Sequence, residues 1–461
     1  MEYVHPSRPR PPLPDDPFLV VGLARSGVAA AIALKGLGKA VHGVDAGHPD
    51  TARELDAAGI GYSLGTDGTE LLEGISTVVK SPGVPEAAPV IAAAVAAGVP
   101  VVGELGRGWR MLDAPFVAIT GTNGKTTTTE MAAHLFRSAD RPVAAAGNVG
   151  QPVTGLATAG LAEGTTVVCE CSSFQLEDSI EFAPECAVYL NLAPDHLDRH
   201  TGMEAYAAAK LKIFENQVEG DVAIINAGPE GPGTDAAGGD AARLFFRAGD
   251  GLDERYDADL RDGTIFIDGE PLMPESDLKV LGRHNVANAM AAALAAISMG
   301  LGREQVAAGL ASFQGVAHRL EAVGEIEGVT WVNDSKATNV EAATVALGSF
   351  EEGVHLILGG SLKGESFDGL LEPVARCCKA VYLIGEATGE LAAALSPATA
   401  RGVKMLSCGD LDMAVLAARQ AAEAGDVVLL SPACASFDQF ENYEQRGDEF
   451  RSLVKELDGL S

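Results

Sequence analysis

The chain has 461 residues, 47% apolar and 21% charged, so it can form about three folded domains, and its composition excludes a disordered or fibrous protein. The 64 acidic residues outnumber the 33 Lys and Arg residues, which gives a net charge of −31. This excess of carboxylates repels nucleic acids and anionic membranes, and the apolar stretches are too interrupted to span a bilayer. We therefore expect no nucleic-acid partner and no membrane insertion.

The cysteines and the N-terminal segment favour a cytoplasmic protein. The seven cysteines lack the spacing of a secreted domain, so we predict reduced thiols. Cys169 and Cys171 could form half of a metal site. No second cysteine pair lies at zinc-finger spacing, however, and we interpret both as buried strand residues. Residues 1–16 are rich in proline and lack the apolar core of a signal peptide, so we interpret them as an extension.

In chain order, apolar strand patterns alternate with helical patterns, beginning with a strand, a glycine turn and an alanine-rich helix. A helix is predicted at 204–216 and another opens near Asn285, after a glycine-rich loop at 228–240 and polar β-like stretches. Strands are predicted at 17–22, 40–46, 76–83, 99–104, 115–120, 165–170, 186–192, 329–334, 354–360, 380–385 and 426–432.

This alternation predicts an α/β protein of three blocks, each a parallel sheet wrapped by helices. We place an N-terminal domain at 17–103, a central domain at 104–315 and a C-terminal domain at 316–461.

The strongest motif is TGTNGKTT at 120–127, which lies between an apolar strand and a helix. Glycines let backbone N–H groups surround phosphate oxygens, and the helix N-terminus adds positive potential. Lys125 would place its charge on the β- and γ-phosphates, and Thr126 or Thr127 would offer a hydroxyl to Mg²⁺. The loop is two residues shorter than the common G-x-x-x-x-G-K-[ST] pattern. Its context favours nucleotide binding over a simple turn.

Acidic residues follow two further strands of the central domain. Glu170 ends the strand at 165–170, and DHLD at 195–198 follows the strand at 186–192. The carboxyl ends of parallel strands meet at one sheet edge, where carboxylates suit hard divalent cations. Glu170 and one member of 195–198 are therefore candidate Mg²⁺ ligands, and ordinary solvated strand ends are the alternative.

The turn after the first strand keeps part of a dinucleotide-binding fingerprint. Gly22 and Gly27 match its outer glycines, Ala24 replaces the middle one, and Asp45 lies near the distance of a ribose-binding acid. This pattern fits a nucleotide-diphosphate pocket and a plain βα turn equally well.

Polar and cationic residues also follow strands of the third block. They are His318 and Arg319, NDSKATN at 333–339, GGSLK at 359–363 and SPACAS at 431–436. At the carboxyl ends of strands such residues suit an anionic small molecule, although each one alone could be a helix cap or a surface residue.

Together these motifs resemble those of the Mur ligases of bacterial cell-wall synthesis, and the resemblance covers nearly all of the chain from about residue 17. The segment at 431–450 is characteristic of the D-glutamate-adding members. The resemblance rests on GTNGKTT (121–127), ECSSFQLE (170–177), DHLDRH (195–200), AAKLKIFEN (208–216), GRHNVANA (282–289), HRLE (318–321), NDSKATN (333–339) and SPACASFDQFENYEQRGDEF (431–450).

The resemblance implies a Rossmann-like N-terminal domain that binds a UDP-sugar. It also implies a central P-loop ATPase-type domain for ATP and a Rossmann-like C-terminal domain for the incoming amino acid. The implied reaction is ATP-dependent addition of D-glutamate to UDP-N-acetylmuramoyl-L-alanine through an acyl phosphate, giving ADP and phosphate. Two Mg²⁺ ions and a monomeric enzyme are expected with it.

The resemblance also implies roles for single residues, among them Lys336 as a catalytic lysine near ATP. Lys210 corresponds to a lysine that the family carbamylates, which makes it a carboxylate on a long arm. The implied ATP contacts are Gly121, Thr122, Asn123, Gly124, Lys125, Thr126, Thr127, Asn288, Arg319 and Asp334. The implied metal ligands are Thr126, Thr127, Glu170, His196 and carbamylated Lys210. The implied UDP-sugar contacts are Ser26, Asp45, Ser81, Asn148, Ser172 and Ser173, and those to D-glutamate are Thr338, Lys363, Ser436 and Tyr443.

Three other functions compete with this one. The first is another ligase of the superfamily, such as folylpolyglutamate synthetase or the diaminopimelate-adding enzyme, although the Asp-Asn-Pro signature of the latter is absent from the C-terminal block. The second is a nucleotide switch that performs no ligation. The third is a dinucleotide dehydrogenase, which Ala24 and the third domain disfavour.

Overall fold

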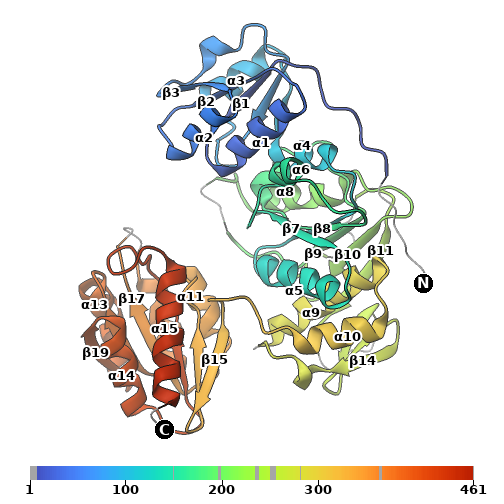
Figure 1. Ribbon diagram of the computed structural model, residues 1–461. Helices are drawn as coiled ribbons and strands as arrows, with labels where there is room; N and C mark the ends of the chain where they lie inside the picture. The colour runs from blue at the N-terminus through green and yellow to red at the C-terminus, as the bar shows by residue number, and fades with distance from the viewer. Residues whose placement is uncertain are drawn as a thin grey trace. The chain divides into compact units, whose positions relative to one another are not determined.

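The computed structural model describes residues 8–148, 150–195, 199–233, 238–249, 256–280, 282–362 and 366–459. Their strands form three sheets in two compact units (Figure 1). One unit, residues 1–277 and 286–312, contains the N-terminal and central sheets, and the other, residues 278–285 and 313–461, contains the C-terminal sheet. The predicted three-domain α/β class is confirmed.

The N-terminal sheet is parallel, with the order β3-β2-β1-β4-β5. Its central strand β1 is an uninterrupted apolar run that is buried along its whole length, as expected for a strand covered on both faces. The strand order reverses between β1 and β4, and such a reversal opens a crevice at the carboxyl ends of the strands. The elements are β1 (Phe18–Val21), α1 (Arg25–Gly36), β2 (Val41–Asp45), η1 (Asp50–Arg53), α2 (Glu54–Ala57), β3 (Gly61–Leu64), η2 (Thr69–Leu71), β4 (Thr77–Lys80), α3 (Pro89–Ala96) and β5 (Val101–Gly103).

The central sheet has the order β14-β13-β12-β11-β10-β9-β6-β8-β7. Strands β6 to β12 are parallel, whereas β13 and β14 are antiparallel additions. Its strands are β6 (Phe116–Thr120), β7 (Val143–Gly147), β8 (Thr166–Glu170), β9 (Cys186–Tyr189), β10 (Val222–Asn226), β11 (Ala242–Arg247), β12 (Ala258–Arg261), β13 (Thr264–Ile267) and β14 (Glu270–Pro274). Its helices are α4 (Glu104–Met111), α5 (Lys125–Ser138), α6 (Val153–Ala159), α7 (Ser173–Glu177), α8 (Met203–Glu215), η3 (Glu275–Asp277), α9 (Arg283–Ser298) and α10 (Arg303–Ser312).

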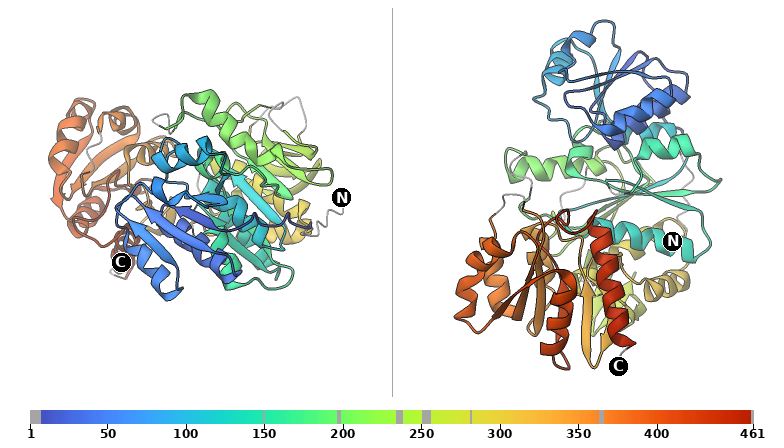
Figure 2. Two further views of the ribbon diagram at one scale, coloured as in Figure 1. Left: turned by 90° about the horizontal axis from the view of Figure 1, so that it is seen from above. Right: turned by 60° about the vertical axis from the view of Figure 1, so that its left-hand side comes forward.

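The C-terminal sheet has the order β15-β16-β20-β17-β18-β19, and only its edge strand β15 is antiparallel. Helices α11 to α13 pack on one face, while α14 and α15 pack on the other (Figure 2). The elements are β15 (Glu321–Ile326), β16 (Val329–Asn333), α11 (Val340–Leu347), β17 (Val354–Gly359), η4 (Asp368–Leu370), α12 (Leu371–Cys377), β18 (Cys378–Ile384), α13 (Thr388–Thr399), β19 (Lys404–Gly409), α14 (Leu411–Ala421), β20 (Val427–Leu430) and α15 (Tyr443–Asp458).

The sheets differ from the sequence prediction mainly at their edges. The antiparallel strands β13, β14 and β15 depart from the purely parallel pattern, and the edge strands β3, β7 and β19 were not predicted. The buried inner strand β10 was missed as well. Edge strands are weakly marked in the sequence because one side is open to solvent and their residues are only partly buried. All seven cysteines are free. Cys169 lies in β8 and Cys171 directly follows this strand, and both are buried. In the described part of the chain, no helix combines the length and apolarity needed to cross a membrane.

The turn between β1 and α1 is tightly packed around Gly27. A Cβ atom at Gly27 would lie 1.8 Å from the carbonyl oxygen of Gly22, so Gly27→Ala must force this turn apart. We expect a loss of about 1–3 kcal/mol in the free energy of unfolding, as for other overpacked sites. Gly36→Ala, in the same helix with open space around it, is the control and should gain about 0.5 kcal/mol. Calorimetry of the transition of this domain measures both, and equal behaviour of the two variants would contradict the prediction.

Candidate active site

The phosphate-binding motif forms the turn between the buried strand β6 and helix α5. Gly124 has a φ of +82°, and a Cβ atom there would lie 2.5 Å from Oδ1 of Asn288, so glycine is required both by conformation and by space. Lys125 folds back over the turn, with Nζ donating to the carbonyl oxygens of Gly121 (3.0 Å) and Thr122 (2.7 Å). The structure thus brings Asn288 of α9 against the motif, although more than 160 residues separate them in the sequence.

Asn191, which the sequence analysis did not select, holds this turn in shape. Its Oδ1 accepts hydrogen bonds from the backbone N–H groups of Thr122 (3.0 Å) and Asn123 (2.8 Å). Its Nδ2 donates to the carbonyl oxygen of Asn123 at 3.1 Å. The residue follows β9, the neighbour of β6 in the sheet, and this adjacency places it beside the turn. Its position just after an apolar strand run was the only sequence signal.

Glu170, at the carboxyl end of β8, lies in the same region and is only 2% exposed. Its Oε1 accepts a hydrogen bond from Nδ2 of Asn148 at 2.9 Å, whereas its Oε2 is buried and has no hydrogen-bond partner among the described residues. A buried carboxylate oxygen without a partner is costly, so its burial indicates a site for a positively charged ligand.

Lys210, on α8, is 1% exposed and donates from Nζ to the carbonyl oxygen of Gly121 at 2.7 Å. Nζ also lies 4.5 Å from the ring centroid of Tyr206. Burial, with a smaller contribution from the charge of Lys125, lowers the pKa of Lys210 to about 7. At neutral pH a large fraction of this amine is therefore uncharged.

His196 lies outside the described residues, and so does Lys363. Asp195 is half-buried and close enough to Lys210 to favour its charged form. Where side chains are described, no group of three or more His, Cys, Asp or Glu residues is arranged to hold a metal ion. Among the described residues, hydroxyl groups are therefore the further ligands available to a cation beside Glu170.

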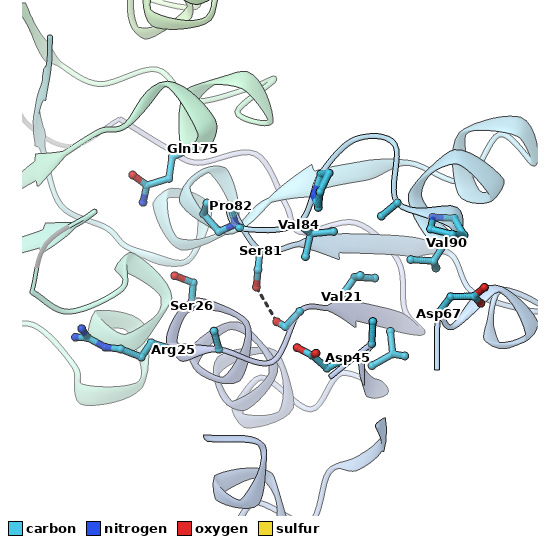
Figure 3. Close-up of a pocket in the computed structure, with 18 of the residues that line it drawn as sticks. Val21, Arg25, Ser26, Asp45, Asp67, Ser81, Pro82, Val84, Val90 and Gln175 are labelled. Atoms are coloured by element: carbon cyan, nitrogen blue, oxygen red, sulfur yellow. Dashed lines mark hydrogen bonds between the residues drawn. The ribbon is translucent and has the colours of Figure 1, made fainter. Parts of the chain in front are cut away.

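A cavity of 530 Å³ opens at the carboxyl ends of β1, β2 and β4 (Figure 3). Ser26, Asp45 and Ser81 line it from the N-terminal domain, and Asn148 and Gln175 line it from the central domain. Figure 3 shows Gln175 at one end of the cavity and Asp67 at the other. The cavity thus collects most of the residues that the sequence analysis assigned to a UDP-sugar.

Two of these side chains already have partners that fix the cavity wall. The Asp45 carboxylate accepts hydrogen bonds from the backbone N–H groups of Leu23 and Gly47, both at 2.7 Å. The Ser81 hydroxyl donates to the carbonyl oxygen of Gly22 at 2.7 Å. Asp45 therefore ties the first βα turn to the second strand, next to the cavity.

Ser172 and Ser173 stand apart from the cavity lining. Ser172 caps α7 in a reciprocal arrangement with Gln175, and Ser173 is buried with its hydroxyl 3.0 Å from Nε2 of His200. Gln175, which lines the cavity, was not selected from the sequence.

In the C-terminal unit, the predicted residues cluster at the end of β16. Asp334 accepts hydrogen bonds from the Ser431 hydroxyl (2.7 Å) and the backbone N–H of Leu320 (3.2 Å), next to Arg319. Burial raises the pKa of Asp334 to about 7, partly offset by the hydrogen bond from Ser431. Lys336 lies two residues after Asp334, and its Nζ is 5.9 Å from the ring centroid of Tyr443.

Arg446 joins two of the predicted loops of this unit, although only the motif around it was noted in the sequence. It is 1% exposed, and its guanidinium donates to the carbonyl oxygens of Ser335 (2.9 Å), Cys434 (3.1 Å) and Ala435 (3.2 Å). It thereby holds the loop that contains Thr338 beside the loop that contains Ser436.

The fold and these sites define a multidomain α/β enzyme with a glycine-rich turn between β6 and α5, a separate cavity at the N-terminal sheet and a polar cluster in the C-terminal unit. Three family models match the chain in sequence order. They are the Mur ligase MurD-like N-terminal domain at residues 16–103, the Mur ligase middle domain at 119–296 and the Mur ligase glutamate ligase domain at 318–434.

Relatives that match along nearly the whole chain point to the same family. A relative from Acidobacterium capsulatum, named UDP-N-acetylmuramoylalanine–D-glutamate ligase, is 41% identical over 446 residues, which is 95% of each chain. A relative of the same name from Myxococcus xanthus is 42% identical over 455 residues, covering 95% of this chain and 98% of that protein. The crystal structure of UDP-N-acetylmuramate–alanine ligase from Thermotoga maritima shares the fold, with a TM-score of 0.57, 18% identity and coverage of 97% and 100%. The chain belongs to the Mur ligase family.

The role of Asn191 can be measured without any ligand. Asn191→Ala removes the side-chain acceptor of two backbone N–H groups, each hydrogen bond being worth about 1 kcal/mol. We expect hydrogen exchange of the Asn123 amide to accelerate by about tenfold, since local opening becomes easier. The Thr122 amide should change less, because it also donates to the backbone carbonyl oxygen of Asn191 at 3.0 Å, which alanine keeps. Asn216→Ala, in the same domain but bonded to the carbonyls of Ile180 and Phe182, is the control. Unchanged exchange at Asn123 would refute this role.

Proposed function

We propose that the protein joins D-glutamate to UDP-N-acetylmuramoyl-L-alanine, with ATP converted to ADP and phosphate. The observation that carries the proposal is a pair of contacts at one edge of the central sheet. Lys210 donates to the carbonyl oxygen of Gly121 in the turn. Glu170, whose charge acts on Lys210, accepts a hydrogen bond from Asn148, which lines the cavity. Relatives that carry this enzyme's name match along 95% of the chain, which supports the same reaction.

ATP is proposed to bind at residues 121–127, where the turn and the N-terminus of α5 favour phosphate. Lys125 would exchange its two carbonyl contacts for phosphate oxygens and neutralise charge that develops on the transferred phosphoryl group. Asn288 supports the turn from α9. From the C-terminal unit, we assign Arg319 and Asp334 to ATP and Lys336 to a catalytic role near it.

The acceptor is proposed to occupy the cavity of the N-terminal domain. The N-terminus of α1, with Ser26, faces this cavity and suits a diphosphate. Asp45 and Ser81 belong to the uridine-diphosphate end, whereas Asn148 lies at the end that leads to Glu170. Ser172 and Ser173 would contribute to acceptor binding indirectly, because they stabilise the start of α7, the helix that contains Gln175. D-Glutamate is assigned to Thr338, Lys363, Ser436 and Tyr443.

The reaction then has two steps. A carboxylate oxygen of the L-alanyl group attacks the γ-phosphorus, the bond to ADP breaks, and an acyl phosphate forms. The amine of D-glutamate, after losing a proton, attacks the acyl carbon and phosphate leaves with the bonding electrons. Water must be kept out because it would hydrolyse the acyl phosphate, so positioning and charge neutralisation are the main tasks of the protein.

The residues present fit Mg²⁺, and we propose two ions. The partnerless Oε2 of Glu170 offers a buried carboxylate ligand, with the buried Thr126 or Thr127 hydroxyl and His196 as further candidates. When bound, Mg²⁺ would supply positive charge to the phosphate oxygens. In a chain of net charge −31, such local cations are needed to hold a triphosphate.

We further propose that Lys210 is carbamylated. The uncharged amine is the form that reacts with CO₂, and the lowered pKa of Lys210 makes that form abundant near neutral pH. The product would be a carboxylate beside Glu170 and the phosphate-binding turn, where it would serve as a ligand. We also propose that the protein works as a monomer in the cytoplasm. Its domains would be residues 17–103, 104–315 and 316–461.

The central test is phosphate release with UDP-N-acetylmuramoyl-L-alanine, ATP and either D- or L-glutamate. We expect release that requires the acceptor and D-glutamate together, and a loss of about 100-fold or more in Lys125→Ala because a charge on the transferred group is removed. Lys35→Ala, a lysine of α1 outside the described sites, should keep normal turnover. Phosphate release without the acceptor would indicate a nucleotide switch. Binding of nicotinamide would indicate a dehydrogenase, and use of other amino acids would indicate another ligase.

The Lys210 proposal predicts a pH-dependent need for CO₂. With its pKa lowered to about 7, the amine is protonated below pH 7 and should not form a carbamate, whereas above pH 7 it should. Enzyme stripped of CO₂ at pH 6 should lose activity and recover it with bicarbonate at pH 8. A ¹³C carbamate signal from labelled bicarbonate should appear in the unmodified protein and be missing in Lys210→Ala. Activity independent of CO₂ at both pH values would overturn the proposal.

A further inference from the structure

The proline-rich extension makes unusually specific contacts with the central domain through its arginines. Nη1 of Arg8 lies 2.8 Å from Oδ2 of Asp221, and its Nε lies 3.7 Å from Oε1 of Glu185. Nη1 of Arg10 donates to Oε1 of Glu185 at 2.9 Å. Both carboxylates are nearly inaccessible, with exposures of 2% for Glu185 and 4% for Asp221. The arginines thus fill an anionic socket formed by Glu185 and Asp221.

The socket is costly without these arginines. Glu185 and Asp221 directly precede the neighbouring strands β9 and β10, so two buried carboxylates lie on adjacent strands. Arg8 contacts both of them, which offsets their mutual repulsion. Glu185 also accepts the backbone N–H of Phe116 at 2.8 Å, at the start of β6. Removing one partner of such a buried ion pair leaves an uncompensated charge and is strongly destabilising.

Farther along, the extension is fastened to both domains of this unit. The guanidinium carbon of Arg10 lies 4.4 Å from the ring centroid of Trp109, on α4. Leu13 packs against the hydrophobic core of the N-terminal domain. The Asp16 carboxylate accepts the backbone N–H of Ala40 at 3.0 Å, just before β2. In Figure 1 the segment is the darkest blue part of the chain before β1.

These contacts lie at the amino ends of the strands, where Phe116, Glu185 and Asp221 precede or begin their strands. The phosphate-binding turn and the cavity lie at the carboxyl ends of the same sheets. The extension therefore holds the two domains from the side opposite the candidate active site. The cavity is lined by both domains, so its shape depends on how they are held together.

We propose that residues 8–16 are a strap that fixes the N-terminal domain on the central domain, and that Arg8 and Arg10 are positioning residues for the nucleotide cavity. The consequence for substrate rests on the proposed function, whereas the docking of the strap does not. Most of the strap precedes residue 16, where the match to the family's N-terminal domain begins.

Trp109 offers a direct probe of the docked strap. The chain has two tryptophans: Trp109 is 3% exposed under Arg10, and Trp331 is fully buried in the other unit. In Arg8→Gln/Arg10→Gln, acrylamide should quench Trp109 several-fold more strongly, and Trp109→Phe should abolish this difference. Arg10→Lys keeps the charge but loses the planar stacking, so it should give an intermediate value in a folded protein. The control is Arg53→Gln/Arg137→Gln, which removes two exposed arginines of the same unit.

Steady-state kinetics of the same variants test the positioning role. We expect KM for UDP-N-acetylmuramoyl-L-alanine to rise about fivefold or more in Arg8→Gln/Arg10→Gln, because the cavity is no longer held in shape. kcat and KM for ATP should stay within about twofold, since the phosphate-binding turn lies within one domain. Stronger quenching with an unchanged KM would refute the positioning role, and unchanged quenching would refute the strap itself. Absence of turnover in the unmodified protein would instead count against the proposed function, and the quenching would still report on the strap.

Discussion

The structure depends on the side-by-side arrangement of β6, β8 and β9, three buried parallel strands of the central sheet. Parallel pairing places their carboxyl ends at one edge, where the residues that end or follow these strands are gathered. The phosphate-binding turn follows β6, Glu170 ends β8, and Asn191 follows β9. No local sequence feature could bring Asn191 within hydrogen-bonding distance of the turn, or place Glu170 at the same edge of the sheet.

Burial then sets the chemistry of the groups gathered at this edge. Lys210 loses the solvation that would keep its amine protonated, and Glu170 has a buried oxygen without a protein partner. Both features are energetically unfavourable in the protein alone, and natural proteins keep such groups where a ligand or a modification compensates them. The same logic applies to Asp334 in the C-terminal unit, whose pKa is raised by burial to about 7.

The socket of Glu185 and Asp221 shows the opposite solution, in which the chain supplies its own cations. Arg8 and Arg10 lie within the first ten residues, yet they are bonded to carboxylates near the middle of the sequence. Buried carboxylates therefore serve two purposes in this acidic protein. Those at the carboxyl edge are left open for ligands, and those at the amino edge are closed by the strap.

The sequence by itself determined the three-domain α/β class, most core strands and the glycine-rich turn between β6 and α5, because local patterns of apolar residues, glycine and lysine specify them. Edge strands, the antiparallel additions and the roles of Asn191, Gln175 and Arg446 were decided only by the tertiary structure. An asparagine or a buried arginine has the same local pattern whether it supports a site or caps a turn. The lowered pKa of Lys210 was likewise out of reach, because desolvation depends on neighbours that are distant in the chain.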